Sequence, residues 1–283
     1  AMSRSRDIAD STKTLDVDGG TIKLDGNYPV GTGNVALGNA ALNASVSGTY
    51  NTATGTNALQ SITSGSNNAA YGGWALQANS TGGSNTAIGR AALEKNTTAS
   101  FNTAVGYQAG YSNTTGGNNV ALGRATLYSN VTGTANTAIG DQSLQNNTGS
   151  ENSALGKGSL NANTSGQYNT GIGRSALNAN TTASDNTAVG YQSLTSNTTG
   201  TRNVGVGYNT LSLNTTANDN TSVGHDALDV NTTGAFNTAL GSSALGSNTT
   251  AAANTAVGYQ ALTTNTTGGD NAAFGYQAAQ SNT

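Results

Sequence analysis

The chain has 283 residues and a net charge of −3, with 8% charged residues, 39 glycines and no cysteine. The low charge, with 34% hydrophobic residues, argues against ordinary charged disorder, and the ten basic residues are too scattered to follow a nucleic-acid backbone. The lack of cysteine excludes disulfide staples and thiolate metal sites, and no apolar run approaches the length of a membrane span.

Residues 1–16 form a short polar segment with alternating charge. It begins AMSRSRDIAD and lacks the apolar core of a signal peptide, so export through a cleaved signal is not expected. An attachment segment and a disordered terminus both fit this composition.

Residues 17–33 contain two short alternating runs around Asp18-Gly19-Gly20, which favours a tight turn. The pattern predicts a short β-hairpin that caps and links to the following array, because the end of a repeat array needs cover. Pro29 is the single proline of the chain and marks the boundary.

Residues 34–283 repeat one 17-residue unit with the consensus N-T-A-[VIL]-G-x-x-A-L-x-x-N-T-T-G-x-x, whose positions are numbered 1 to 17. Fifteen copies follow one another at steps of 17 residues, apart from one step of 16 residues. A fixed short period is typical of solenoids and fibrous arrays. The first asparagines of the copies are Asn34, Asn51, Asn68, Asn85, Asn102, Asn119, Asn136, Asn152, Asn169, Asn186, Asn203, Asn220, Asn237, Asn254 and Asn271.

The repeat is too short for a helical hairpin, and its glycines and threonines disfavour helix. Thr-Ala-Val before Gly, and Ala-Leu before Asn-Thr-Thr-Gly, are strand-like runs bounded by turn residues. We therefore predict an all-β fold, a parallel β-solenoid or β-roll with one coil of two short strands per repeat. Fifteen coils at one inter-strand spacing each would form a rod on the order of 70 Å long.

Position 5 is glycine in every copy and predicts a sharp corner, because glycine adopts positive φ at little cost. Position 4 is apolar in all copies but one, and position 9 is leucine in thirteen. Alternation along a strand predicts that positions 2, 4 and 9 point inward. Stacked asparagines at positions 1 and 12 are expected to form amide ladders. The predicted structural corners include Gly89, Gly106, Gly123, Gly140, Gly190 and Gly258.

Positions 3 and 8 are nearly always Ala, Ser, Thr or Gly, and the same alternation places them on the opposite face. Such a small-residue face favours the close approach of another backbone and indicates a coaxial homotrimer. A monomeric solenoid with a solvated small-residue face is the alternative.

Position 6 varies and carries long aromatic or basic side chains, which would form a stripe along the rod. One interpretation is a carbohydrate-binding surface. The other, which the residues favour, is packing over the coil corner or across a subunit boundary. Position 17 adds Tyr50, Phe101, Tyr168 and Phe236. The candidate binding residues at position 6 are Arg90, Tyr107, Arg124, Arg174, Tyr191, Tyr208, His225, Tyr259 and Tyr276.

The sequence offers little catalytic chemistry, and we expect no enzyme activity, cofactor or metal site. His225 is the single histidine and lies at a variable position, and the spacing of a phosphate-binding loop is absent. Acidic residues recur at position 17, as in Asp185, Asp219 and Asp270, without the pattern of a calcium-binding repeat. The Asn-Thr-Thr triplets are formal glycosylation acceptors, but their regular spacing favours a structural role.

NTAVG at 102–106, NVALG at 119–123 and NSALG at 152–156 resemble the N-[ST]-x-A-[IVL]-G signature of trimeric autotransporter adhesin heads. That family folds as a left-handed parallel β-roll closed as a trimer, with shorter coils than this repeat. NTAVGYQAL at 254–262 is more similar to the repeats of phage tail-fibre proteins, especially those of marine phages, as is the lead-in at 19–42.

The resemblance implies a trimeric, non-enzymatic fibre on a virion, outside the cell. Its partners would be other copies of the chain, the phage particle through the N-terminal segment, and a host cell-surface polysaccharide or protein. Neither nucleic acid nor membrane insertion is expected. An ice-binding solenoid, with threonine rows at positions 13 and 14, is an alternative, although adjacent threonines should face opposite sides. The head of a bacterial trimeric surface adhesin is another.

Overall fold

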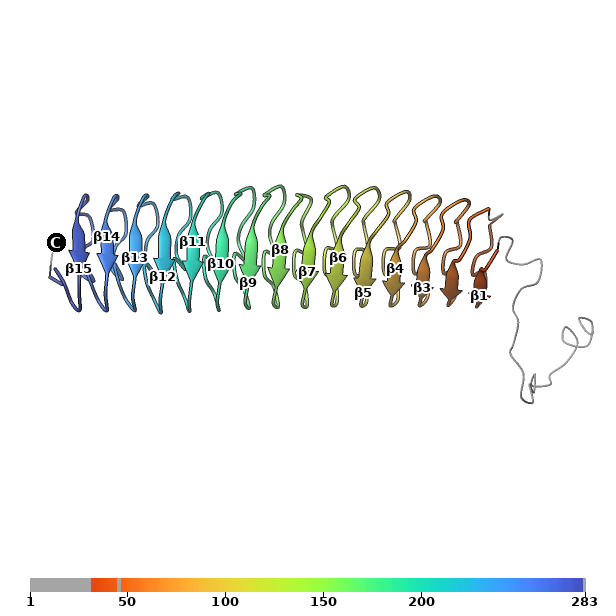
Figure 1. The fold of residues 1–283 in the computed structure, drawn as a ribbon, viewed down its shortest axis with the longest axis horizontal. Coiled ribbons are helices and arrows are strands. Elements are labelled where there is room, and N and C mark those ends of the chain that lie inside the picture. The colour runs from red at the N-terminus through yellow and green to blue at the C-terminus, as the bar shows by residue number, and fades with distance from the viewer. Residues whose placement is uncertain (1–31, 45–46, 282–283) are drawn as a thin grey trace, which may run out of the picture.

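The computed structural model describes residues 32–44 and 47–281. The described residues form one straight rod of stacked coils, with fifteen short strands side by side in a single parallel sheet (Figure 1). The predicted parallel β-solenoid is confirmed. Residues 1–16, and the hairpin predicted at 17–33 apart from a turn at 32–33, lie outside the described residues.

Each strand pairs with the strand of the next coil, in chain order and without a crossover. The register joins equivalent repeat positions, as in Thr187↔Val204, and it continues through the 16-residue step, where Thr137 pairs with Ser153. The strands are β1 (Val35–Leu37), β2 (Thr52–Thr54), β3 (Ala69–Tyr71), β4 (Thr86–Ile88), β5 (Thr103–Val105), β6 (Val120–Leu122), β7 (Thr137–Ile139), β8 (Ser153–Leu155), β9 (Thr170–Ile172), β10 (Thr187–Val189), β11 (Val204–Val206), β12 (Thr221–Val223), β13 (Thr238–Leu240), β14 (Thr255–Val257) and β15 (Ala272–Phe274).

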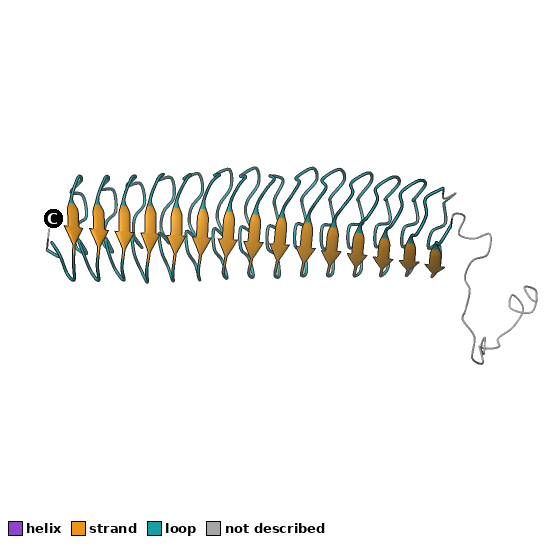
Figure 2. Ribbon diagram, in the orientation of Figure 1, coloured by secondary structure: helices purple, strands orange, loops and turns teal. Residues whose placement is uncertain are grey.

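Each coil contains one strand, at positions 2 to 4, and the prediction of a second strand at positions 8 to 11 is wrong. This part of the coil is a chain of turns, drawn as loop in Figure 2. In the fourth coil Ala91 and Leu93 have φ of 58° and 49°, a left-handed conformation that a strand cannot contain. The Ala-Leu run therefore bends around the core instead of crossing it straight.

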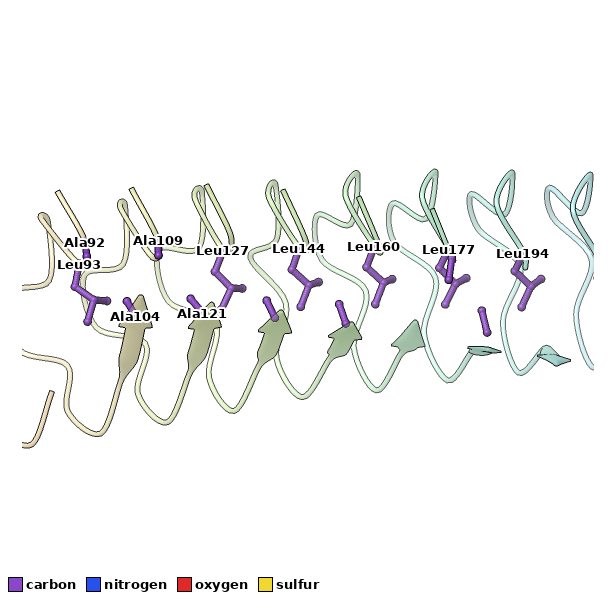
Figure 3. Close-up of a cluster of buried hydrophobic side chains, with 14 of the residues drawn as sticks. Ala92, Leu93, Ala104, Ala109, Ala121, Leu127, Leu144, Leu160, Leu177 and Leu194 are labelled. Atoms are coloured by element: carbon purple, nitrogen blue, oxygen red, sulfur yellow. The ribbon is translucent and has the colours of Figure 1, made fainter. Parts of the chain in front are cut away.

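The core is a column of leucines from position 9 facing alanines from the strands (Figure 3). Leu177 and Leu194 are completely buried, which confirms that position 9 points inward. The prediction for the strand is wrong. Position 3, as in Ala188, and position 8, as in Ser193, are buried, whereas position 4 points outward and leaves Leu155 47% exposed.

The strand has this orientation because the coil is thin. At Gly171, in position 3, an added Cβ would lie 2.5 Å from Ser159 Oγ and 3.3 Å from Leu160 Cγ. The space between strand and leucine column therefore holds only a small side chain, which is alanine in most coils and serine at the largest. A valine or isoleucine has no room there, and a shift of one residue turns it to solvent.

The predicted amide ladder at position 1 is confirmed. Asn186 is fully buried, and its Nδ2 donates to Asn169 Oδ1 at 3.2 Å and to the Gly200 carbonyl at 2.9 Å. Its Oδ1 accepts from the backbone N–H of Asn203 at 3.0 Å and from Asn203 Nδ2 at 3.2 Å. Each rung thus binds the coils on both sides, satisfying buried polar groups that no water reaches.

A second ladder follows position 12. Asn197 Nδ2 donates to Asn180 Oδ1 at 3.0 Å and to the Gly200 carbonyl at 2.9 Å. The next residue, Thr198, donates its hydroxyl to the carbonyl of Thr215 in the following coil. Because Asn180 and Asn197 are completely buried, these Asn-Thr-Thr triplets serve the fold and their amides are inaccessible to modification.

The corner glycines at position 5 adopt φ between 123° and 140° in every coil. An added Cβ at Gly106 would lie 2.5 Å from the carbonyl oxygen of Gly123, which is backbone and has little freedom to move. The predicted corners are therefore confirmed, and they require glycine for both conformation and space.

The leucine column has one gap, where Gly110 occupies position 9 in the fifth coil. Leu93 and Leu127 lie on either side of it, and a cavity of about 10 Å³ remains between them. The backbone at Gly110 has φ of 61°, close to that of the leucines in other coils, so the coil keeps its shape without the side chain.

Candidate functional site

The outer sheet face is the surface formed by the side chains of positions 2 and 4. Position 2 carries threonine in nine coils and is half-buried or exposed, and position 4 carries an apolar side chain in fourteen of fifteen coils. Ile88 is 42% exposed and Leu240 is 47% exposed. The column at position 4 runs the whole length of the rod and contains Leu37, Thr54, Tyr71, Ile88, Val105, Leu122, Ile139, Leu155, Ile172, Val189, Val206, Val223, Leu240, Val257 and Phe274.

The position 6 column lies along one edge of this face, directly after the corner glycines. Its aromatic rings stack between successive coils. Tyr191 and Tyr208 have ring centroids 5.3 Å apart, Tyr208 and His225 are 4.9 Å apart, and planes in each pair diverge by 12°. A second pair, Tyr259 and Tyr276, is 5.3 Å apart with planes at 14°.

Cations extend the aromatic stacks. The guanidinium carbon of Arg90 lies 4.8 Å from the Trp74 ring and 5.7 Å from the Tyr107 ring, and that of Arg174 lies 5.8 Å from the Tyr191 ring. These are cation–π distances. The two arginines and the two tyrosines occupy position 6 of their coils, whereas Trp74 occupies position 7 of the coil before Arg90, and the structure brings them into contact.

The stacking limits what this column can bind. Within a stack each ring turns its face to the next ring, so the inner members offer solvent only edges, hydroxyls and ring nitrogens. A sugar that needs an open aromatic face finds one only at the ends of a stack. The inner rings suit hydrogen bonding to an adjacent polar surface, because ring edges carry partial positive charge.

Two ion pairs lie at the edges of the face. Arg124 Nε is 2.8 Å from Asp141 Oδ1, and Lys157 approaches the same carboxylate at 4.0 Å. Arg202 binds Asp219 with both guanidinium branches, at 2.7 and 2.9 Å. These hydrogen bonds and the positive charge of Arg202 lower the pKa of Asp219, and desolvation opposes them in part.

His225 donates its Nδ1–H to its neighbour Asp226, with Nδ1 and Oδ2 2.8 Å apart. Its side chain is exposed. Among the residues that the structure describes, no group of three or more His, Cys, Asp or Glu side chains could hold a metal ion. Helices long and apolar enough to span a membrane are likewise absent from that part of the chain.

One aromatic cluster was not predicted from the sequence. Tyr111 and Tyr128, both at position 10, stack with centroids 5.0 Å apart and planes at 6°, and Lys95 Nζ lies 4.9 Å from the Tyr111 ring. Their separation of 17 residues is the signal that could have revealed them, since the same spacing identifies the position 6 stacks.

Comparison with known proteins gives this chain no relative: no family model, no curated protein and no solved structure matches it. The assignment of function therefore depends on the residues and on the geometry of the rod.

Proposed function

We propose that this chain is a shaft segment of a phage tail fibre: a rigid, non-enzymatic rod that assembles as a coaxial homotrimer and spaces or presents host-receptor binding. The observation that carries the proposal is the outer sheet face, where an apolar column extends unbroken over thirteen coils, from Tyr71 to Phe274. Monomeric soluble proteins rarely expose a continuous apolar patch of this length.

The size of the face suits a permanent assembly. A face about 70 Å long and, between its two edges, about 20 Å wide has on the order of 1,400 Å², estimated from strand spacing and rise per residue. Standard stable interfaces bury about 800 Å² per partner. Three copies that turn this face toward a common axis would give the thin coils a shared apolar core.

A rod of this kind suits a structural role better than catalysis. Every coil is joined to the next by the strand ladder and the position 1 asparagine ladder, and the position 12 ladder adds bonds from Asn79 to Asn248. A structure held by repeated short-range contacts keeps its direction over its length. The similarity of the NTAVGYQAL repeats to marine-phage tail fibres supplies the setting, a virion outside the cell, attached through residues 1–16, with a host polysaccharide or protein as receptor.

Light scattering of the purified chain tests the assembly. We expect three times the chain mass of 27.9 kDa, and a mass that stays monomeric at high concentration would contradict the proposal. Val189→Asp, on the outer face, should leave the coils folded and dissociate the assembly. Leu194→Asp, in the fully buried column, should unfold the coils around it.

Immunogold labelling tests the biological setting. Antibody raised against residues 34–283 should label the tail fibres of virions. Labelling of a bacterial surface in the absence of phage would instead support the head of a trimeric surface adhesin.

Ice binding is a second candidate, because the structure provides a flat array that the sequence pattern did not indicate. Positions 2 and 4 face the same side, so threonines such as Thr187 alternate with branched apolar side chains such as Val189 in a regular lattice. At position 13 the threonine hydroxyl is instead bonded to the backbone, as in Thr198. Thermal hysteresis at micromolar concentration of a monomeric chain would favour this candidate over the fibre.

A further inference from the structure

The two edges of the outer sheet face carry opposite charge. Each strand is preceded by an outward position 17 residue and followed by an outward position 6 residue, as Glu151 and Lys157 flank β8. We call these columns the entry margin and the exit margin. The entry margin has four acids and one arginine, a net −3, and the exit margin has four cations and one acid, a net +3. The charged members are Glu151, Asp185, Arg202, Asp219 and Asp270 on the entry margin, and Arg90, Arg124, Asp141, Lys157 and Arg174 on the exit margin.

The two margins also match coil by coil. In no coil do the entry and exit residues carry like charge. Where the residue on one margin is charged or aromatic, the residue on the other margin is often one that could form an ion pair, a cation–π contact or a ring contact with it. The two residues lie beyond opposite ends of the same strand. The matched pairs are Phe101 with Tyr107, Glu151 with Lys157, Tyr168 with Arg174, Asp185 with Tyr191, Arg202 with Tyr208, Asp219 with His225 and Asp270 with Tyr276.

Within one chain these partners cannot meet. Glu151 and Lys157 lie beyond opposite ends of β8, and the run from residue 152 to residue 156 alone spans about 13 Å. At that distance exposed charges are separated by more than a Debye length at physiological salt. Arg202 and Asp219 pair within the entry margin, and Arg124 and Asp141 pair within the exit margin. Contact between the two opposite margins requires the exit margin of one chain to lie against the entry margin of another.

Cyclic symmetry produces this contact. When three chains turn their outer faces to one axis, each corner of the assembly joins the exit margin of one chain to the entry margin of the next, a heterologous interface that closes as a ring. The symmetry rotates one chain onto the next about the common axis without moving it along that axis, so equivalent coils of the three chains lie at the same height. From these observations we infer that the chains associate in parallel and in coil register. Each position 6 side chain pairs with the position 17 side chain that precedes the equivalent strand in the neighbouring chain.

Other registers fit less well. A shift by one coil in one direction pairs Arg174 with Asp185 but places Asp141 against Glu151, two carboxylates. A shift by one coil in the other direction pairs Arg174 with Glu151 but places Arg202 against His225 and leaves Lys157 against Ala135. The in-register arrangement avoids like-charge contacts, which suppress wrong pairings at interfaces.

The inference rests on the proposed trimer and assigns a role to the position 6 stacks. Their edges, hydroxyls and cations would lie along the seams between chains, opposite carboxylates and rings of the neighbouring chain. This explains why rings such as Tyr208 are stacked face to face along the rod and offer edges sideways.

Disulfide trapping tests the register, and the lack of native cysteine removes background reactions. The double variant Glu151→Cys/Lys157→Cys should be oxidised to a covalent trimer on a non-reducing denaturing gel. A bond within one chain is excluded because disulfides need Cα atoms within about 7 Å. The controls are each single variant and Glu151→Cys/Arg174→Cys, which is out of register by one coil, and none of these should yield covalent trimer.

The outcomes separate the two proposals. A trimer by light scattering whose out-of-register variant cross-links as well as the in-register one would overturn the register and leave the fibre proposal intact. A monomeric reduced protein would overturn both. As an independent measurement, Glu151→Lys should raise the midpoint concentration for trimer dissociation by about tenfold, and adding Lys157→Glu should restore it. No restoration by the second change would contradict the pairing.

Discussion

Replacement of one rung of the position 1 ladder should reveal how much the buried amides contribute to stability. In Asn186→Ala, the buried N–H of Asn203 loses its partner, whereas the carbonyl of Gly200 keeps the hydrogen bond from Asn197. A buried group left without a partner destabilises by about 1–3 kcal/mol, and this is the expected loss. Asn169 Oδ1 is less affected, since it keeps the backbone N–H of residue 186.

Asn186→Asp tests the same rung without removing volume. The carboxylate keeps the acceptor for Asn203 but turns its second oxygen toward three other oxygens, those of Asn169 Oδ1, Ser184 and Gly200. At pH 7 it is also a buried charge with no counter-charge. We expect a larger loss than for Asn186→Ala, and a deficit that shrinks as the pH falls, because burial favours the protonated carboxyl in the folded state.

Guanidinium unfolding at one fixed protein concentration measures both variants, since assembly makes stability concentration-dependent. Hydrogen exchange of the neighbouring coils shows whether the loss is local. Asn118→Asp is the matched control, because Asn118 is exposed with φ of 59° at a position where other coils carry aspartate. It should change stability by less than about 0.5 kcal/mol. If Asn186→Asp were as stable as the control variant at pH 7, the ladder would not support the fold as described.

The remaining predictions concern the core, the gap in it and one ion pair. Leu194→Ala should lower the unfolding free energy by about 2–5 kcal/mol, whereas Tyr191→Ser, which loses one exposed ring contact, should lower it by about 1 kcal/mol; equal losses in denaturant titrations would contradict the orientation of the coil. Gly110→Leu should raise stability by about 1 kcal/mol by completing the leucine column, provided that Leu93 moves aside, because an added Cβ would lie 2.9 Å from Leu93 Cδ2; a lower melting temperature would show that Leu93 cannot move. Arg202→Gln should raise the pKa of Asp219 toward the ordinary aspartate range in a carbon-13 NMR titration, because hydrogen bonds from Arg202 hold it low. Any stability that the Arg202–Asp219 pair contributes is present at pH values above the ordinary aspartate pKa. It is lost as the pH falls through the lowered pKa of Asp219.

The period of the repeat was sufficient to predict the solenoid, its length, its corners and its asparagine ladders. The inward side of the strand was predicted wrongly, because a rule that larger apolar residues are buried chose position 4 over position 3. The informative signal was the range of sizes. Position 3 never exceeds a serine, as in Ser222, whereas position 4 ranges from Thr54 to Phe274. A strict size limit indicates contact on all sides, and a varied column indicates open space.

The prediction of a second strand was wrong for a different reason. Leucine has little preference for positive φ, so nothing in the residue Leu93 reveals its left-handed backbone. That conformation is imposed by the packing of a 17-residue coil around a single leucine. The stacks at position 6 could be anticipated as a column, but whether rings offer faces or edges depends on ring angles that the sequence does not determine.

The 16-residue coil shows where this architecture tolerates a change of chain length. The missing residue falls in the corner at Thr148 and Gly149, where Asn136 and Asn147 both still donate to the Gly149 carbonyl, at 2.9 and 2.8 Å. Strand register above and below is unchanged. Coils of unequal chain length can therefore share one rod, provided that the difference falls at this corner and the carbonyl that both asparagines bind is kept.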